Sequence, residues 1–263
     1  MDAILTTNQL KKQFGGLTAV NNLDFFVERN KINALIGPNG SGKTTTLNMI
    51  SGALCPTSGE ILLDGVHMEG QKEFRVARQG IRRTFQNLKL FWRLTAKENV
   101  MMGGEGSDES IVRYIFTPGR TMRMERELAE KAMEKLAFVG LQDMGDKLVS
   151  DIPYGQQKLI EIARALMGEP KLLLLDEPAT GLNPTERAAL VELLLKIKAS
   201  GITILIIEHN MDVIMRISDC ITAINFGTKI AEGTPEEIQN NQAVIEAYLG
   251  ANYQKIDTGK EAR

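Results

Sequence analysis

Short apolar runs recur along the chain, and each is followed by a polar or glycine-rich turn. They lie at Ile32–Ile36 (with Asn33 inside it), 172–175, 202–207 (with Thr203) and 221–224 (with Thr222). Continuous apolar runs of this length are typical of strands buried on both faces, as in a parallel sheet. From about residue 171 onward the order strand, helix, strand repeats, which favours an α/β layered domain. The pattern predicts an α/β core around a parallel sheet.

Two regions depart from that pattern. Residues 3–27 and 60–64 alternate like half-buried strands, with turns such as Phe14-Gly15-Gly16. They predict a small antiparallel sheet beside the main one. Residues 87–154 are mostly helical in pattern, with loop signals at 103–106 and 117–119. Within them, Leu128, Ala132 and Leu136 form one apolar stripe, which predicts an inserted helical subdomain.

Four helix starts can be placed from capping patterns. Thr95 with Glu98, Asn183-Pro184 with Glu186, and Thr234-Pro235 with Glu237 carry N-terminal capping signals, and a further helix over 156–167 follows Gly155. We therefore expect one domain over residues 1–253. It comprises a core at about 1–86 and 155–235, the insert at 87–154, a C-terminal helix at 235–250, and a fraying tail at 254–263.

Composition narrows the function classes. The 263 residues are 43% hydrophobic and 24% charged, which excludes disorder as the main state. With 31 Lys and Arg against 33 Asp and Glu, the balance argues against a nucleic-acid partner bound by bulk charge. Two cysteines and two histidines are too few for a disulfide scaffold or a structural zinc site. No run approaches the ~20 apolar residues of a membrane span, so a membrane role requires a partner protein.

Residues 37–44 match the phosphate-binding loop pattern G-x-x-x-x-G-K-[ST]. The residues expected to bind nucleotide are Gly37, Pro38, Asn39, Gly40, Ser41, Gly42, Lys43, Thr44 and the following Thr45. Glycines let backbone N–H groups turn toward phosphates, and the following helix adds its positive end. Lys43 supplies a point charge for the β- and γ-phosphates, and the Thr44 hydroxyl is a ligand for Mg²⁺. A strand before the loop and a helix after it strengthen the prediction of nucleotide binding.

Polar residues follow the other apolar runs. Asp176 and Glu177 end the run 172–175, where α/β sheets place their ligands. We expect Asp176 to hold the Mg²⁺ shell and Glu177 to orient or deprotonate an attacking water. His209 follows the next run and is expected to contact the γ-phosphate. Gln86, at the border of the insert, is expected to contact Mg²⁺ or water and to report nucleotide state to the insert.

These motifs together resemble the nucleotide-binding subunit of an ABC transporter, over nearly the whole chain. The phosphate loop, Gln86, residues 154–157, Asp176-Glu177 and His209 occur in that family's order and approximate spacing. Finer detail resembles the ATPases of branched-chain amino-acid importers, at Phe14-Gly15-Gly16, Arg83-Thr84-Phe85-Gln86, Tyr154-Gly155-Gln156-Gln157, Gly181-Leu182-Asn183-Pro184 and Ala247-Tyr248-Leu249-Gly250. Urea-importer ATPases are close to that group, and the lipopolysaccharide-export ATPase shares the C-terminal pattern.

The resemblance implies an ATPase at the cytoplasmic face of the cell membrane that energises a separate integral membrane permease, with ATP and Mg²⁺ as cofactors. Two copies, or this chain and a paralogue, would close head to tail around two ATP molecules. Phe14 would stack on adenine, with Val20 as an apolar wall, and residues 180–183 would pass between the two sites. Tyr154, Gly155 and Gln156 would contact the partner's nucleotide, because nothing in this chain's own phosphate loop uses that helix N-terminus.

One residue departs from the family pattern. The family's signature is usually Leu-Ser-Gly-Gly-Gln, whereas this chain has Ile152-Pro153-Tyr154-Gly155-Gln156. Pro153 removes both a hydroxyl and a backbone N–H, so the contact of the usual serine with the γ-phosphate is lost. We hypothesise that turnover persists but that the closed dimer is weakened.

Two other function classes share parts of this motif set. Soluble ABC ATPases of translation or DNA repair usually carry two such domains or a long coiled insert, and this chain has neither. A small-molecule kinase would share the phosphate loop, but residues 152–156 and 180–183 argue against it.

Overall fold

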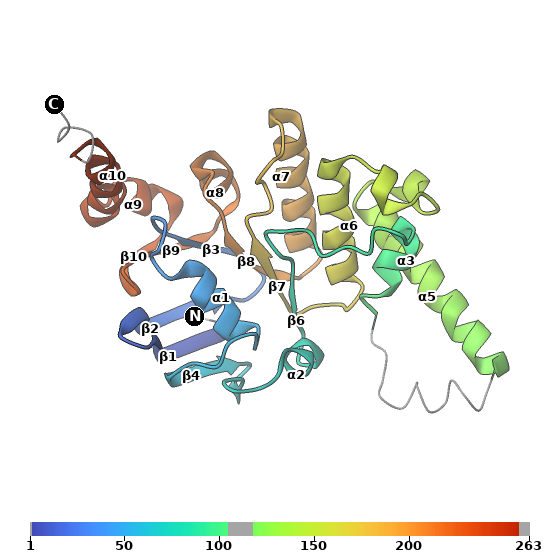
Figure 1. Cartoon of the computed structure of the whole chain (residues 1–263), viewed down its shortest axis with the longest axis horizontal. Coiled ribbons are helices and arrows are strands. Elements are labelled where there is room, and N and C mark those ends of the chain that lie inside the picture. The colour runs from blue at the N-terminus through green and yellow to red at the C-terminus, as the bar shows by residue number, and fades with distance from the viewer. Residues whose placement is uncertain (1, 105–117, 258–263) are drawn as a thin grey trace.

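The computed structural model describes residues 2–104 and 118–257, and a six-stranded sheet forms their centre (Figure 1). The strand order is β10-β9-β3-β8-β7-β6. The strands are β3 (Ile32–Ile36), β6 (Ile81–Arg83), β7 (Leu172–Asp176), β8 (Thr203–Ile207), β9 (Cys220–Asn225) and β10 (Thr228–Gly233). All neighbours are parallel except β10, which pairs antiparallel with β9. The predicted parallel core is confirmed.

The continuous apolar runs are explained by burial on both faces of this sheet. Along β3, Ile32, Ala34 and Ile36 belong to one hydrophobic cluster, whereas Leu35 between them belongs to another. Strands β7 and β8 alternate between the same two clusters. Since successive strand residues point to opposite faces, each face needs its own apolar positions. No polar alternation remains in these strands.

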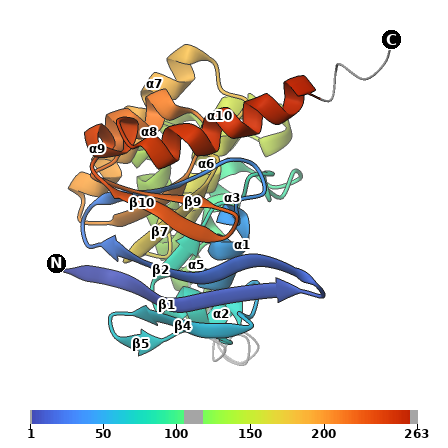
Figure 2. The same ribbon diagram turned by 90° about the vertical axis from the view of Figure 1, so that its left-hand side faces the viewer.

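The predicted antiparallel sheet forms the layer on one side. Its order is β2-β1-β4-β5, from β1 (Ala3–Phe14), β2 (Leu17–Glu28), β4 (Ser58–Leu63) and β5 (Val66–His67). Figure 2 shows this sheet on one side of β9 and β10, with α7 (Pro184–Ala199) and α8 (Met211–Ile217) on the other. Two further helices, α1 (Lys43–Ile50) and α2 (Glu73–Arg78), follow β3 and β5 in the chain.

The C-terminal region differs from the expected single helix over 235–250. The chain forms α9 (Pro235–Gln239) and then α10 (Gln242–Asp257), which includes part of the tail expected to fray. Asn240 caps the end of α9, and the Asn241 side chain accepts from the N–H groups of Ala243 and Val244. Two consecutive asparagines therefore end one helix and start the next, because their side chains satisfy free backbone groups.

The remaining helices gather at one end of the molecule, away from the antiparallel sheet (Figure 1). They are α3 (Ala96–Met101), α5 (Pro118–Phe138), the short 3₁₀ turns η1 (Gln142–Met144) and η2 (Val149–Asp151), and α6 (Tyr154–Leu166). Ala132 and Leu136 of the predicted stripe are fully buried, and Leu128 packs against the same cluster. The division of the chain into core, insert and tail remains a prediction.

The helices predicted from capping residues are present, but one predicted loop and one predicted helix start differ from the structure. The capping box at Thr95 and Glu98 is present, as are those of α7 and α9. The expected loop at 117–119 is already helical from Pro118, a residue that suits the first turn of a helix. Helix α6 begins at Tyr154, two residues before the expected start. Residues 105, 106 and 117 lie outside the described part.

Candidate nucleotide-binding and hydrolysis site

The phosphate loop connects β3 to α1, and backbone crowding explains two of its glycines. A Cβ at Gly37 would lie 2.1 Å from the carbonyl oxygen of Ile224. At Gly42, which precedes α1 with a φ of 104°, a Cβ would lie 2.6 Å from the carbonyl oxygen of Ala19. No larger residue fits either position without moving main chain. The loop thus curls tightly against β9 and β2.

The ammonium group of Lys43 is enclosed by this loop. Its Nζ donates to the carbonyl oxygens of Gly37 at 2.8 Å and Pro38 at 3.0 Å. Burial lowers the pKa of Lys43, and the nearby carboxylates of Glu177 and Asp176 act in the opposite direction. Because a charge in a desolvated site interacts more strongly with an anion than the same charge in water, this position suits a phosphate.

A cleft joins the phosphate loop to the ends of β7 and β8. Its lining residues are Ala19, Asn39, Gly40, Ser41, Gly42, Lys43, Thr44, Thr45, Glu177 and His209. Residues predicted from separate motifs are therefore neighbours in space. Parallel strands with their carboxyl ends at one edge of the sheet produce this arrangement.

The two residues expected to contact adenine, Phe14 and Val20, differ in exposure and in position relative to the cleft. Phe14 is 47% exposed at the end of β1 and lies outside the cleft lining, with Lys12 Nζ 5.2 Å from its ring centroid. Its contact with adenine stays a prediction. Val20 is 0% exposed and packs beside Gly42. The expected apolar wall at Val20 is corrected, because its side chain supports the phosphate loop from inside while Ala19 faces the cleft.

The carboxylate of Glu177 is the meeting point of the predicted polar residues. Its Oε1 lies 2.6 Å from His209 Nε2, and its Oε2 accepts from Gln86 Nε2 at 2.8 Å. The hydroxyl of Thr180 also donates to Oε2, at 3.3 Å. These partners fix the orientation of the carboxylate at the edge of the cleft. A carboxylate oriented in this way is suited to act on a water molecule beside a phosphate.

The main chain around Glu177 is constrained as well. Its φ of 48° is unusual for a residue with a side chain, and its N–H donates to Ile207 O at 2.8 Å. Glu208, a buried residue that sequence analysis missed, accepts from the N–H groups of Ala179 and His209. Glu208 thereby connects the loop after β7 to the loop after β8. An acidic residue directly before His209 was the only sequence signal for it.

One carboxylate oxygen of Asp176 accepts a hydrogen bond, and the other has no hydrogen-bond partner. Its Oδ2 accepts from Arg83 Nη2 at 2.8 Å, whereas its Oδ1 is buried without a hydrogen-bond partner. Arg83 also donates to Asn48 and Ser51, so this buried arginine holds the carboxylate in place. An unsatisfied buried acceptor is costly, and it fits a ligand position for a cation. Thr44, Gln86 and Asp176 therefore suit Mg²⁺, which takes few protein ligands and completes its shell with phosphates and water.

The N-terminus of α6 is not free of the chain's own groups. A Cβ at Gly155 would lie 2.5 Å from Glu186 Oε1, and a Cβ at Gly181 would lie 2.9 Å from the ring of Tyr154. The contact of Tyr154, Gly155 and Gln156 with a partner's nucleotide stays a prediction. Pro153 occupies the N-cap of α6, where no side chain caps the helix. Tyr154, Gly155 and Gln156 do not line the phosphate-loop cleft.

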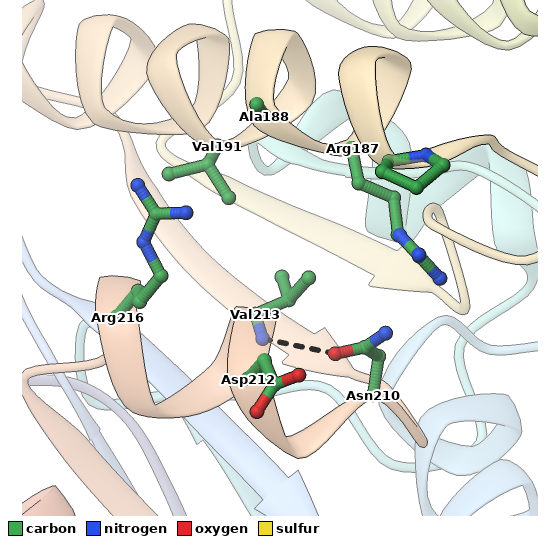
Figure 3. A pocket seen from close by; sticks show the side chains of 8 residues that line it. Arg187, Ala188, Val191, Asn210, Asp212, Val213 and Arg216 are labelled. Carbon is green, nitrogen blue, oxygen red and sulfur yellow. Dashed lines mark hydrogen bonds between the residues drawn. The ribbon is translucent and has the colours of Figure 1, made fainter.

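A separate cavity lies between α7 and α8 (Figure 3). Val191 and Val213 form its apolar wall, and Arg187 and Arg216 come from the two facing helices. None of the residues predicted to bind nucleotide lines it.

A phosphate loop that faces a strand-end acidic pair and a histidine defines a P-loop nucleotide hydrolase. The comparison with protein families narrows this class. The family described as ABC transporter matches residues 20–180, and that of the branched-chain amino acid ATP-binding cassette transporter matches residues 228–253. The chain belongs to the ABC transporter family of ATP-binding proteins, whose activity is ATP hydrolysis coupled to transport.

Individual relatives agree with this assignment. The chain is 43% identical to the high-affinity branched-chain amino acid transport ATP-binding protein BraF of Pseudomonas aeruginosa, over 94% of this chain and 98% of BraF. It is 41% identical to LivG of Escherichia coli over the same shares. The ADP conformation of an ATP-binding cassette of an ABC transporter superposes with a TM-score of 0.83 at 32% identity, covering 95% and 100% of the two chains.

Proposed function

We propose that this chain is the ATP-hydrolysing subunit of an importer for branched-chain amino acids and energises a separate membrane permease. The observation that carries hydrolysis is the carboxylate of Glu177, held by His209 and Gln86 at the mouth of the phosphate loop. The match of residues 228–253 and the relatives BraF and LivG support the substrate class.

In this proposal the polar groups of the cleft divide the steps of hydrolysis among them. The phosphate loop and Lys43 hold the β- and γ-phosphates. Thr44, Gln86 and Asp176 would hold Mg²⁺, which would supply positive charge beside the phosphate oxygens. Glu177 orients an attacking water and takes its proton as the water oxygen bonds to the γ-phosphorus and the bond from the γ-phosphorus to the bridging oxygen breaks, releasing ADP. His209 keeps Glu177 in place and contacts the γ-phosphate.

We further propose that the working unit contains two ATPase subunits and a permease. The N-terminal end of α6 offers backbone N–H groups at a distance from this chain's own cleft, which supports its use by a second copy or a paralogue. Within the described residues no helix is long and apolar enough to cross a membrane. The proposed site of action is the cytoplasmic face of the membrane, through contact with the permease.

Transport by the assembled complex tests the substrate class. The membrane protein that co-purifies with this chain is placed in vesicles with its binding protein, and ATP is supplied on the side of this chain. We expect ATP-dependent accumulation of labelled leucine, isoleucine or valine, and none with Glu177→Gln in the complex. Accumulation of urea instead, or extraction of lipopolysaccharide, would contradict the proposed substrate.

The proline of the signature segment gives a second test. We expect Pro153→Ser to strengthen ATP-dependent dimerisation by about thirtyfold, because serine restores a hydroxyl at the N-cap and a backbone N–H, each worth about 1 kcal/mol. Light scattering of a hydrolysis-deficient background in the presence of ATP measures the dimer. Pro153→Ala, which restores only the N–H, is the matched control. Dimerisation no stronger than that of the unaltered chain would overturn the hypothesis.

A further inference from the structure

Three charged side chains on one side of α6 hold the main chain of the segment that carries Gln86. They are Lys158, Glu161 and Arg164, spaced three residues apart, and we call them the α6 clamp. Lys158 Nζ donates to the carbonyl oxygen of Gln86 at 2.9 Å. Arg164 Nη1 donates to the carbonyl oxygen of Lys89 at 2.5 Å. The segment 85–89 is therefore held at both of its ends by cations from one helix.

Glu161 completes the clamp with the opposite charge. Its Oε1 accepts from the backbone N–H of Phe85 at 3.4 Å and lies 3.5 Å from Arg164 Nη2. Donors and acceptors of α6 thus match acceptors and donors of the main chain in segment 85–89. The side chain of Gln86 remains free to reach Glu177.

Because the charged groups are buried, separating segment 85–89 from α6 is energetically unfavourable. Lys158 is 3% exposed and Glu161 is 2% exposed. Burial raises the pKa of Glu161, with Arg164 acting against it. Buried charges are tolerated when they are paired and hydrogen-bonded, and they become strongly unfavourable when a partner is removed. If segment 85–89 moved away from α6, Lys158 would lose the carbonyl oxygen of Gln86, and Glu161 and Arg164 would keep only each other, so segment and helix are expected to move as one body.

We infer that Lys158, Glu161 and Arg164 are positioning residues that join Gln86 to α6. Gln86 contacts the hydrolytic Glu177, and α6 begins at Tyr154 and Gly155. A displacement of Gln86 at one nucleotide is thereby transmitted to the helix end proposed to contact the other nucleotide. This inference rests on the proposed function for its consequence in turnover, but the clamp itself is tested without turnover.

Hydrogen exchange measures the clamp directly in the full chain. We expect Lys158→Met to increase amide exchange over 85–89 by about tenfold, because a hydrogen bond from a charged group is lost. The matched control is Lys196→Met, since Lys196 Nζ also donates to a backbone carbonyl, that of Phe138, at 2.8 Å. The control should leave exchange over 85–89 unchanged. Arg164→Met, at a less buried position, makes the same test at Lys89 if Lys158→Met does not fold.

Measuring ATP turnover distinguishes a positioning role of Lys158 from a general effect on protein stability. We expect Lys158→Met to lower kcat by about tenfold, for the same lost interaction, with KM for ATP changed by less than about twofold. In a Gln86→Ala background, Lys158→Met should cause no further loss, because Lys158 acts through Gln86. Lys158→Arg keeps a donor and should retain most of the activity.

The outcomes that overturn the inference are distinct from those that overturn the proposed function. Unchanged exchange over 85–89 in both Lys158→Met and Arg164→Met would refute the clamp, even if the chain hydrolyses ATP. An independent tenfold loss in the Gln86→Ala background would refute action through Gln86. Lack of ATP hydrolysis by the unaltered chain, together with the expected exchange result, would refute the proposed function alone.

Discussion

Replacing Glu177 with glutamine is expected to lower ATP hydrolysis by about 10²–10⁴-fold while ATP still binds. Glutamine keeps the size of the side chain and its contacts with His209 and Gln86, but it cannot take a proton from water. Binding then proceeds without turnover, so the variant should accumulate as a closed dimer. Phosphate release measures the rate, and light scattering in the presence of ATP measures the dimer.

The matched control for this change is Glu192→Gln, at an exposed position on α7 outside the cleft lining. It removes the same charge at a distance from the site and should leave hydrolysis unaltered. If Glu177→Gln hydrolyses ATP at the full rate, Glu177 is not the base. If the rate falls but ATP binding is lost as well, the defect lies in the site's structure and the assignment is also contradicted.

Replacing Lys43 with alanine is expected to weaken ATP binding by about two orders of magnitude and to abolish measurable turnover. The ammonium contributes charge-assisted hydrogen bonds to phosphates, each worth about 1.5–3 kcal/mol. It is also the donor that satisfies the carbonyl oxygens of Gly37 and Pro38. Calorimetric titration with ATP and Mg²⁺ measures the affinity.

Lys196→Ala serves as the control, because Lys196 also donates to a main-chain carbonyl but lies on α7 with Phe138 as its partner. Its affinity for ATP should match that of the unaltered chain. Unchanged ATP affinity and turnover in Lys43→Ala would show that the phosphate loop does not bind nucleotide as proposed. The thermal unfolding midpoint of both variants checks that the fold is retained.

Both experiments address a site that comes from four separate loops. The loops after β3, β6, β7 and β8 converge because all four strands are parallel and end at the same edge of the sheet. The hydrolytic carboxylate therefore has its partners, His209 and Gln86, at distances of 2.6 and 2.8 Å despite large separations in sequence.

The local sequence pattern predicted most strands of the central sheet and several helix starts. Apolar runs predicted β3, β7, β8 and β9, because a strand buried on both faces is predominantly apolar. Capping residues predicted the starts of α3, α7 and α9, since they satisfy free N–H groups within three residues. The C-terminal region was predicted less well, as the helix break at Asn240 and Asn241 depends on side-chain geometry.

The amino-acid sequence by itself determined the class of chemistry, because phosphate binding requires glycines, a lysine and a hydroxyl within a few consecutive positions such as 37–44. Only the tertiary structure decided which distant residues support that chemistry. Val20 was expected at the nucleotide and lies inside the core. Arg83 lay in a motif that was assigned no role for it, and Lys158 lay in no motif, yet they hold Asp176 and the main chain of Gln86. Such contacts join residues far apart in the chain, so packing, and not local pattern, selects them.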